Sequence, residues 1–232
     1  MTSQPRNFNP DFYYHIYNRA VKEKSRIFEG ARDYQRFVSL LEYYKLERRI
    51  PYSQFIDLSL SHRPNLEGSR EERAIIVAFA IMPNHFHLLV KPDKNNPGKL
   101  SRFVSDLING YTRYFNLKYE RSGVLFQGKF KSKEIRDEES VLQLSRYIHL
   151  NPLLSKKANR TGKIKSPQDW RYSSYQDWIG FKNSSVTNQE EVEFWASKVG
   201  GPAGYREFVE AKISSDRILS GVEDLIIEKT QN

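Results

Sequence analysis

Two histidines on a short apolar segment are the residues of this chain best suited to chemistry. His85 and His87 stand in the run 82–90 (MPNHFHLLV). Alternate side chains of a β-strand share a face, so the two imidazoles project from one side, about 7 Å apart along the strand. Two imidazoles fixed on a rigid strand are typical of a metal site. The pattern also arises by chance, so its meaning depends on what other elements bring to that face.

A second candidate pair, Tyr147 and Asn151, belongs to a helix that we expect over residues 137–150. Asn151 and Pro152 should end it, because the residue before a proline is pushed out of the helical region. A spacing of four residues leaves Tyr147 and Asn151 about 40° apart on one face. Tyr147 should then lie at the border of the packed and open surfaces. This position suits a reactive phenol, and it equally suits a structural tyrosine.

The elements that must position these residues follow the order β-α-β-β-α-β. Apolar periodicity predicts strands over 12–19, 74–81, 85–91 and 126–135, and helices over 31–49 and 100–119. Two prolines and many polar residues in 50–73 predict a long loop or insertion. The order is that of the ferredoxin-like fold, an α+β antiparallel sheet with helices on one face. A tyrosine-bearing helix and a helical tail complete the expected fold.

The composition limits the class of protein. A chain of 232 residues suits one domain, expected over 1–180, with a C-terminal helical extension over 181–232. The absence of cysteine excludes disulfides, thiolate metal sites and cysteine nucleophiles. The polar first nine residues lack the apolar stretch of a signal peptide, and no apolar run approaches a membrane span. A cytoplasmic protein is therefore expected.

Positive charge is concentrated in the body of the chain. The net charge is +9, although residues 181–232 hold six basic and nine acidic residues. A basic body indicates an anionic partner, with nucleic acid the leading candidate and a merely soluble basic surface the alternative. Basic residues near the first and last strands, interleaved with aromatic residues, suit a single strand. The candidate DNA contacts are Arg19, Lys118, Arg121, Lys129, Lys131, Lys133 and Arg136.

Two motifs in combination resemble a known family. The run 82–90, followed by the run 145–152 (SRYIHLNP), resembles the single-tyrosine HUH transposases of the IS200-like type. More narrowly, the chain is similar to their REP-associated tyrosine transposase branch. Four further segments extend the resemblance over about residues 12–180. They are 14–19 (YHIYNR), 111–118 (YTRYFNLK), 123–132 (GVLFQGKFKS) and 170–175 (WRYSSY).

The resemblance implies an enzyme that cleaves and rejoins single-stranded DNA through a covalent 5′-phosphotyrosine, at hairpin or REP-like elements. By position, His85 and His87 become metal ligands, Tyr147 the nucleophile and Asn151 a third polar ligand. The implied cofactor is a divalent metal, Mg²⁺ or Mn²⁺. Mg²⁺ prefers oxygen ligands and Mn²⁺ accepts imidazole more readily, so a site with both kinds of ligand leaves the choice open. The family contains dimers and apparent monomers, so the oligomeric state stays open.

Two other functions remain possible from the sequence. The first is a DNA-binding module of the same fold that has lost catalysis. The second is an unrelated metal-dependent hydrolase on His85 and His87, which normally needs a further strong ligand such as Asp or Glu. The remaining histidines, His15, His62 and His149, have no evident partner in the sequence and are predicted to lie outside the site.

Overall fold

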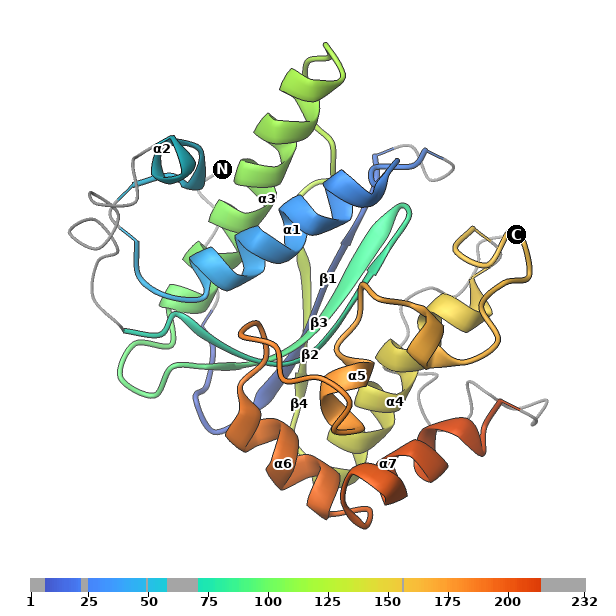
Figure 1. The fold of residues 1–232 in the computed structure, drawn as a ribbon. Helices are drawn as coiled ribbons and strands as arrows, with labels where there is room; N and C mark the ends of the chain where they lie inside the picture. Colours follow the sequence, from blue (N-terminus) through green and yellow to red (C-terminus); the bar gives the residue numbers. More distant parts are fainter. Residues whose placement is uncertain (1–6, 22–24, 49, 58–70, 156, 214–232) are drawn as a thin grey trace.

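The chain folds around a four-stranded antiparallel sheet (Figure 1). The computed structural model describes residues 7–21, 25–48, 50–57, 71–155 and 157–213. The strands lie in the order β2-β3-β1-β4 and are β1 (Tyr13–Arg19), β2 (Ala74–Met82), β3 (His85–Pro92) and β4 (Lys131–Ile135). Together with two helices that alternate with them, this is the ferredoxin-like arrangement, and the predicted α+β class is confirmed.

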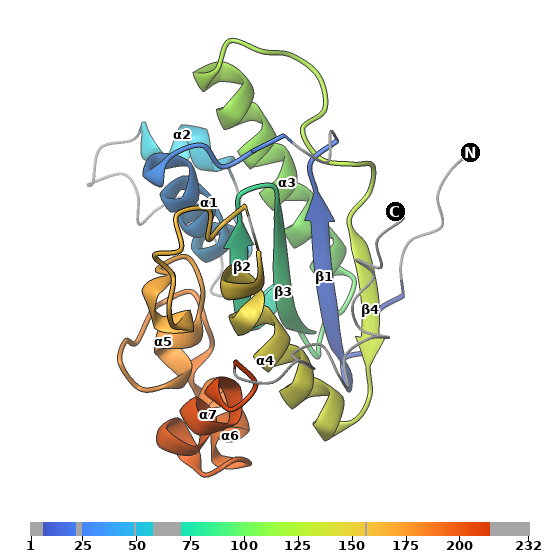
Figure 2. The same ribbon diagram turned by 90° about the vertical axis from the view of Figure 1, so that its right-hand side faces the viewer.

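Two helices, α1 (Ala31–Tyr44) and α3 (Lys99–Lys118), cover one face of the sheet (Figure 2). Phe86 of β3 turns to this side and is fully buried. Its ring lies 5.0 Å from that of Phe37 on α1, which in turn lies 5.2 Å from the ring of Tyr111 on α3. This packing fixes β3, so the strand holds His85 and His87 in place on its other face.

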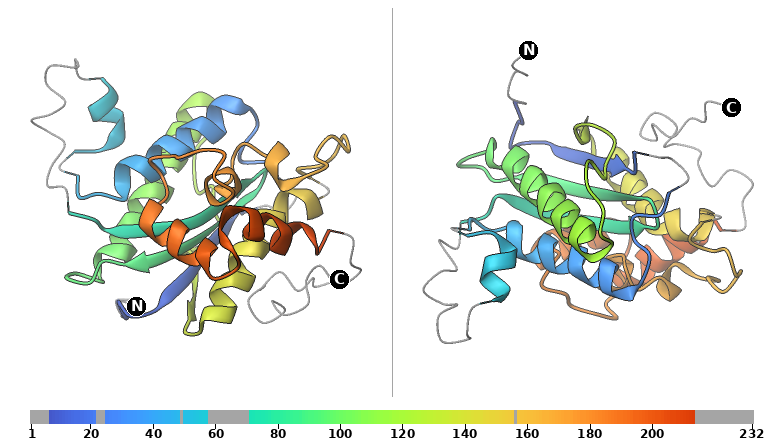
Figure 3. Two further views of the ribbon diagram at one scale, coloured as in Figure 1. Left: turned by 60° about the horizontal axis from the view of Figure 1, so that its bottom comes forward. Right: turned by 90° about the horizontal axis from the view of Figure 1, so that it is seen from above.

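The opposite face is covered by a second group of helices (Figure 3). They are α4 (Glu138–Leu154), α5 (Tyr175–Trp178), α6 (Gln189–Ser197) and α7 (Gly201–Glu210). The indole N–H of Trp178 donates to the Val77 carbonyl at 3.0 Å, while Trp195 and Tyr205 are buried in the same cluster. The expected helical tail is present as α6 and α7, while its residues 214–232 lie outside the described residues. A domain boundary near residue 180 stays a prediction. No helix within the described residues is long and apolar enough to span a bilayer.

Helix α4 runs further than its sequence suggests. It was predicted to end at Leu150, but it continues through Pro152 to Leu154. Asp137 caps its start by accepting a hydrogen bond from the Ser140 amide at 2.7 Å. The amide of Ser155 donates to the Asn151 carbonyl at 3.0 Å and closes the last turn after the proline. Tertiary packing of α4 on the sheet thus overrides the local preference of a pre-proline residue, and Asn151 keeps helical geometry.

Two other elements differ from the predicted ones. The strand predicted over 126–135 begins only at Lys131; Phe126 makes an isolated bridge to Ala20, and Gly128 has a φ of +61°. This left-handed glycine turns the chain between the bridge and the strand. The predicted loop 50–73 contains a short helix, α2 (Tyr52–Ile56), while its residues 58–70 lie outside the described residues. Helix α1 ends at Tyr44, five residues before its predicted end.

His149 lies in a buried polar network behind α4, away from His85 and His87, as predicted. Its Nδ1 lies 2.7 Å from the Tyr205 hydroxyl, and its Nε2 lies 2.8 Å from the Ser174 hydroxyl. The Tyr205 hydroxyl donates onward to Ser145 Oγ at 2.9 Å. Burial lowers the pKa of His149 to about 3. The imidazole is therefore neutral at neutral pH, and it serves the packing of α4 on α7.

This buried imidazole predicts a loss of stability in acid. Below pH 6.5 the unfolded chain binds a proton at His149 that the folded chain does not, so the free energy of unfolding falls with pH until about pH 3. Between pH 7 and pH 5 the contribution of His149 should be about 2 kcal/mol. Urea unfolding of the wild type and of His149→Gln at both pH values measures it. An equal pH dependence in the two proteins would contradict the prediction.

Candidate active site

Strand β3 presents His85 and His87 on one face, as their alternation predicts. Their ring centroids lie 4.9 Å apart. The register of β2 on β3 fixes the positions of the two histidines. In this hairpin Met82 of β2 stands opposite His85, and Ala80 stands opposite His87. In the turn, Asn84 Oδ1 lies 2.9 Å from His85 Nδ1. This contact holds one nitrogen of His85 and leaves Nε2 directed to the centre of the site.

Helix α4 brings Tyr147 and Asn151 to the same place. The Asn151 amide lies between the histidines: its Oδ1 is 3.4 Å from His85 Nε2, and its Nδ2 is 3.4 Å from His87 Nε2. The Tyr147 ring lies 5.4 Å from the His87 ring. The four residues that sequence analysis selected therefore meet in one cluster, built from a strand and a helix that are distant in sequence.

Tyr147 is more enclosed than predicted. It was expected at the border of an open surface, but its side chain is 4% exposed and packs in the apolar cluster that includes Leu89 and Met82. Helix α4 lies close against β2 and β3, so the side of the helix that carries Tyr147 faces the sheet. His85 and Asn151 are also buried, at 8% and 5% exposed. The cluster is thus held in a largely enclosed environment.

His15 is a member of this cluster that sequence analysis missed. Its Nε2 lies 2.9 Å from His87 Nδ1, and the two rings stack with centroids 5.1 Å apart. The prediction that His15 lies outside the site is wrong. The missing signal was the pairing of β1 with β3, in which Tyr17 stands opposite His87 and His15 lies two residues away on the same face. His62 lies outside the described residues.

The electrostatics of the cluster keep its central imidazole neutral. Burial lowers the pKa of His87 well below its ordinary value, and the neighbouring His85 and His15 lower it further. A neutral imidazole has a lone pair for a metal ion, whereas a protonated one has none. The contact of Nδ1 with His15 leaves Nε2 of His87 as the nitrogen that faces Asn151. This arrangement suits a ligand that approaches the two Nε2 atoms together.

The donor set fits a divalent metal ion with open coordination positions. It would consist of two imidazole nitrogens, from His85 and His87, and one amide oxygen, from Asn151. Within the described residues no third His, Cys, Asp or Glu completes a metal cluster there. The Asn151 oxygen is therefore the third ligand that the geometry offers. Nitrogen and oxygen donors suit Mn²⁺, and Mg²⁺ would rely more on added water and phosphate oxygens.

Three of the predicted DNA contacts share the face of this cluster. Lys131 and Lys133 of β4 stand opposite Tyr17 and His15, and Arg19 stands opposite His85. The Lys131 ammonium lies 5.9 Å from the Tyr17 ring, and Arg19 Nε donates to Gln127 Oε1 at 2.5 Å. A basic border thus runs along the β1–β4 side of the cluster.

The other four predicted contacts are not on the strand positions that face the cluster. Lys118 forms an ion pair with buried Asp33 at the end of α3, and the Arg121 guanidinium lies 5.6 Å from the Phe115 ring. Arg136 pairs with Glu134 at 2.7 Å, and Lys129 is exposed. Their roles in DNA binding, like those of the first three, stay predictions.

Comparison with known proteins agrees with the resemblance seen in the sequence. Residues 66–151 match the family model described as "Transposase IS200 like", a span that includes His85, His87, Tyr147 and Asn151. A curated protein of Haemophilus influenzae, named as a REP-associated tyrosine transposase, is 31% identical over 124 residues. That alignment covers 45% of this chain and 66% of the relative, just under two thirds of its length.

A solved structure shares the fold. It is described as a REP-associated tyrosine transposase bound to a REP hairpin, and it superposes with a TM-score of 0.52 over 81% of this chain and 98% of its own. Sequence identity is 15%, so this likeness concerns the fold.

Proposed function

We propose that this chain is a transposase of the IS200-like family, and that it cleaves and rejoins single-stranded DNA with Tyr147 as the nucleophile. The observation that carries the proposal is the convergence of the Asn151 amide on His85 Nε2 and His87 Nε2, beside the Tyr147 ring. A metal-binding pair and a phenol within one small cluster are what a tyrosine transesterase requires.

The proposed reaction is a transesterification. The Tyr147 oxygen attacks the scissile phosphorus and forms a phosphotyrosine bond to the 5′ side of the break. The bond from phosphorus to the 3′ oxygen breaks, and that oxygen leaves with a proton as a free 3′ hydroxyl. Rejoining reverses these steps with the 3′ hydroxyl of a second strand. The phosphoester is conserved throughout, so no nucleotide hydrolysis is needed.

His85, His87 and Asn151 are the residues that would hold Mg²⁺ or Mn²⁺. When bound, the ion supplies Lewis-acid polarisation of a nonbridging phosphate oxygen. Asn84 and His15 contact the Nδ1 atoms of His85 and His87 and orient both rings. Enclosure of Tyr147 on the sheet limits the rotamers of its ring and thereby the direction of attack.

The proposed substrate is a DNA hairpin with an adjoining single strand. A relative of the same fold is described as bound to a REP hairpin, and Lys131, Lys133 and Arg19 border the cluster with positive charge. Tyr147 lies beside His87 of its own chain, which supports a site complete in one chain. We therefore expect cleavage at hairpin or REP-like elements.

A covalent-adduct assay tests this function. The full chain is incubated with a 5′- or 3′-labelled single-stranded hairpin oligonucleotide from the flanks of its own gene, with Mn²⁺, Mg²⁺ or EDTA. A metal-dependent adduct, detected on a denaturing gel and mapped by mass spectrometry to the Tyr147 peptide, is the expected result. Tight, metal-independent binding without any adduct would instead favour the inactive DNA-binding module.

His15 should act as a positioning residue for His87. Removing its contact in His15→Phe is expected to weaken Mn²⁺ binding by about 10- to 100-fold, the usual effect of losing an outer-shell partner of a metal-binding histidine. His15→Gln, whose amide can still meet His87 Nδ1, should restore part of the affinity. Calorimetric titration of Mn²⁺ into each protein measures this. Equal affinities for wild type and His15→Phe would remove His15 from the site.

A further inference from the structure

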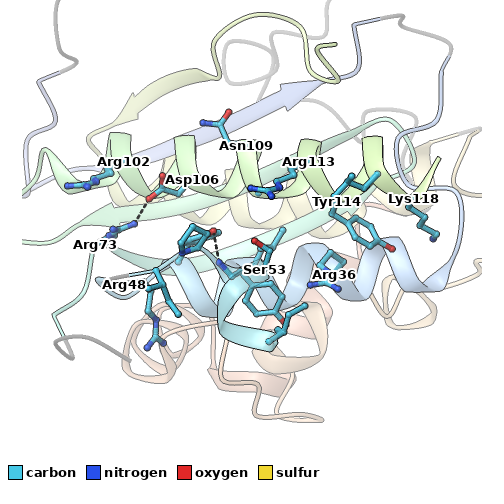
Figure 4. Close-up of a pocket in the computed structure, with 18 residues that line it drawn as sticks. Arg36, Arg48, Ser53, Arg73, Arg102, Asp106, Asn109, Arg113, Tyr114 and Lys118 are labelled. Carbon is cyan, nitrogen blue, oxygen red and sulfur yellow. Dashed lines mark hydrogen bonds and ion pairs between the residues drawn. The ribbon is translucent and has the colours of Figure 1, made fainter. Parts of the chain in front are cut away.

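A second candidate site lies on the far side of the sheet, in a groove formed by α1, α2 and α3. The groove encloses a cavity of about 690 Å³, a size typical of pockets for small organic ligands (Figure 4). Six of the side chains that line it are basic, and they are Arg36, Arg48, Arg73, Arg102, Arg113 and Lys118. Asp106 is the one acidic residue among the described residues that line it. The residues of the proposed cleavage site are on the opposite face of the sheet.

Some of these cations are neutralised within the fold and others are not. Arg73 pairs with Glu47 at 2.6 Å and with Asp106 at 2.7 Å, and Lys118 pairs with Asp33. Arg36 and Arg113, by contrast, form no ion pair and donate no hydrogen bond to any residue that the structure describes. The groove therefore keeps at least two guanidinium groups whose N–H donors can serve a ligand.

Aromatic rings hold one of these guanidinium groups in position. The Arg36 guanidinium lies 5.1 Å from the Tyr52 ring and 4.9 Å from the Tyr114 ring. Such cation–π contacts fix the planar group while leaving its N–H edges unused. The planar surfaces of tyrosine and arginine are also the ones on which nucleobases stack. The groove thus combines donors for a phosphate with flat surfaces for a base.

The short helix α2 is hydrogen-bonded to α1 beside the cavity. The Tyr44 hydroxyl of α1 accepts a hydrogen bond from the Tyr52 amide at 3.0 Å. Gly110 of α3 makes room for this tyrosine, because a Cβ atom there would lie 3.2 Å from Tyr44 Cε2. α2 is thus tied to α1, and its residues Tyr52, Ser53 and Ile56 form one wall of the cavity.

We propose that this groove binds a nucleoside phosphate unit, with the phosphate on Arg36 and Arg113 and the base on the tyrosine and arginine planes. Guanidinium groups are the preferred protein partners of phosphate, because their N–H fork matches its oxygens. The cavity accommodates one nucleotide and is too small for a duplex. The unit can come from a free mononucleotide or from a nucleotide of a DNA strand that extends beyond the cleavage site.

The test uses the full chain with two fluorescent probes, etheno-AMP and a fluorescein-labelled single-stranded oligonucleotide. Arg36→Gln and Arg113→Gln are each expected to weaken binding by about tenfold, the effect of one charged hydrogen-bond donor. Arg32→Gln is the matched control, because it removes the same charge from an exposed position of α1 outside the groove. It should leave binding within about twofold of the wild type.

The two probes distinguish the sources. Weaker etheno-AMP binding in the groove variants identifies a free mononucleotide site, and weaker oligonucleotide binding alone identifies a nucleotide of a DNA strand. The exposed Arg113 provides a variant that does not disturb the packing of α2. The proposal would be overturned if Arg32→Gln weakened the binding of both probes as much as the groove variants do. It would also be overturned if no variant changed the binding of either probe. Adduct formation at Tyr147 is scored separately, so failure here leaves the cleavage function untouched.

Discussion

Replacing Tyr147 with phenylalanine is expected to abolish adduct formation and strand cleavage, with a fall in rate of at least about a thousandfold. The substitution removes the only atom that would form the bond to phosphorus and leaves the ring in place. The Tyr17 ring also lies near the His87 ring, at 6.0 Å against 5.4 Å for Tyr147, but Tyr17 belongs to β1 and not to the helix that carries Asn151. The residual rate should therefore approach that of a protein without a nucleophile.

Binding should survive this change. The Tyr147 ring packs in the apolar cluster with Leu89 and Met82, and phenylalanine keeps that packing. Affinity for the hairpin oligonucleotide, measured with Ca²⁺ or without metal, should therefore stay within about threefold of the wild type. A catalytic loss with retained binding separates the nucleophile from a structural tyrosine, because a structural role predicts that both fall together.

A matched control comes from another buried tyrosine. Tyr175→Phe removes a hydroxyl that donates to Glu210 at 3.0 Å, and its ring lies beside His149, whereas Tyr147 lies beside His87. It should change stability slightly and adduct formation hardly at all. Comparable adduct yields for Tyr147→Phe and the wild type would refute the assignment of the nucleophile.

Much of the fold could be predicted because it depends on local periodicity. Alternation placed His85 and His87 on one face of β3, and a spacing of four placed Tyr147 and Asn151 together on α4. The order of strands and helices then identified the sheet topology. These inferences use geometry that neighbouring residues fix by themselves.

The predictions that were wrong concern features that depend on contacts between distant segments of the chain. His15 joins the cluster through the register of β1 on β3, which sequence periodicity does not specify. Tyr147 is enclosed because α4 lies close against the sheet, and Pro152 stays helical for the same reason. The groove near α2 could not be predicted from the sequence either, because side chains of three helices form it and part of it lies in a segment predicted as a loop. Tertiary packing decided each of these features.

Loss of either histidine should remove metal-dependent cleavage. For His85→Ala and for His87→Ala we expect Mn²⁺ binding to fall by at least about a hundredfold and cleavage by at least about a thousandfold, because two donors remain where three converged. Mn²⁺ binding is measured from the signal of the free ion in electron paramagnetic resonance. Cleavage is measured on the same hairpin oligonucleotide as before.

The two histidines should differ in their effect on stability, and this difference tests the geometry. His87 is 2% exposed and contacts His15, so His87→Ala leaves a cavity and a buried imidazole without its partner, at a cost of about 2 kcal/mol. His85 lies at the edge of the cluster, 8% exposed, so His85→Ala should lower the free energy of unfolding by less.

Asn151→Asp keeps an oxygen donor and adds a charge, so it should retain or strengthen Mn²⁺ binding, whereas Asn151→Leu should weaken it. If Asn151→Leu binds Mn²⁺ as the wild type does, the third ligand is not Asn151 and the donor set proposed here is wrong.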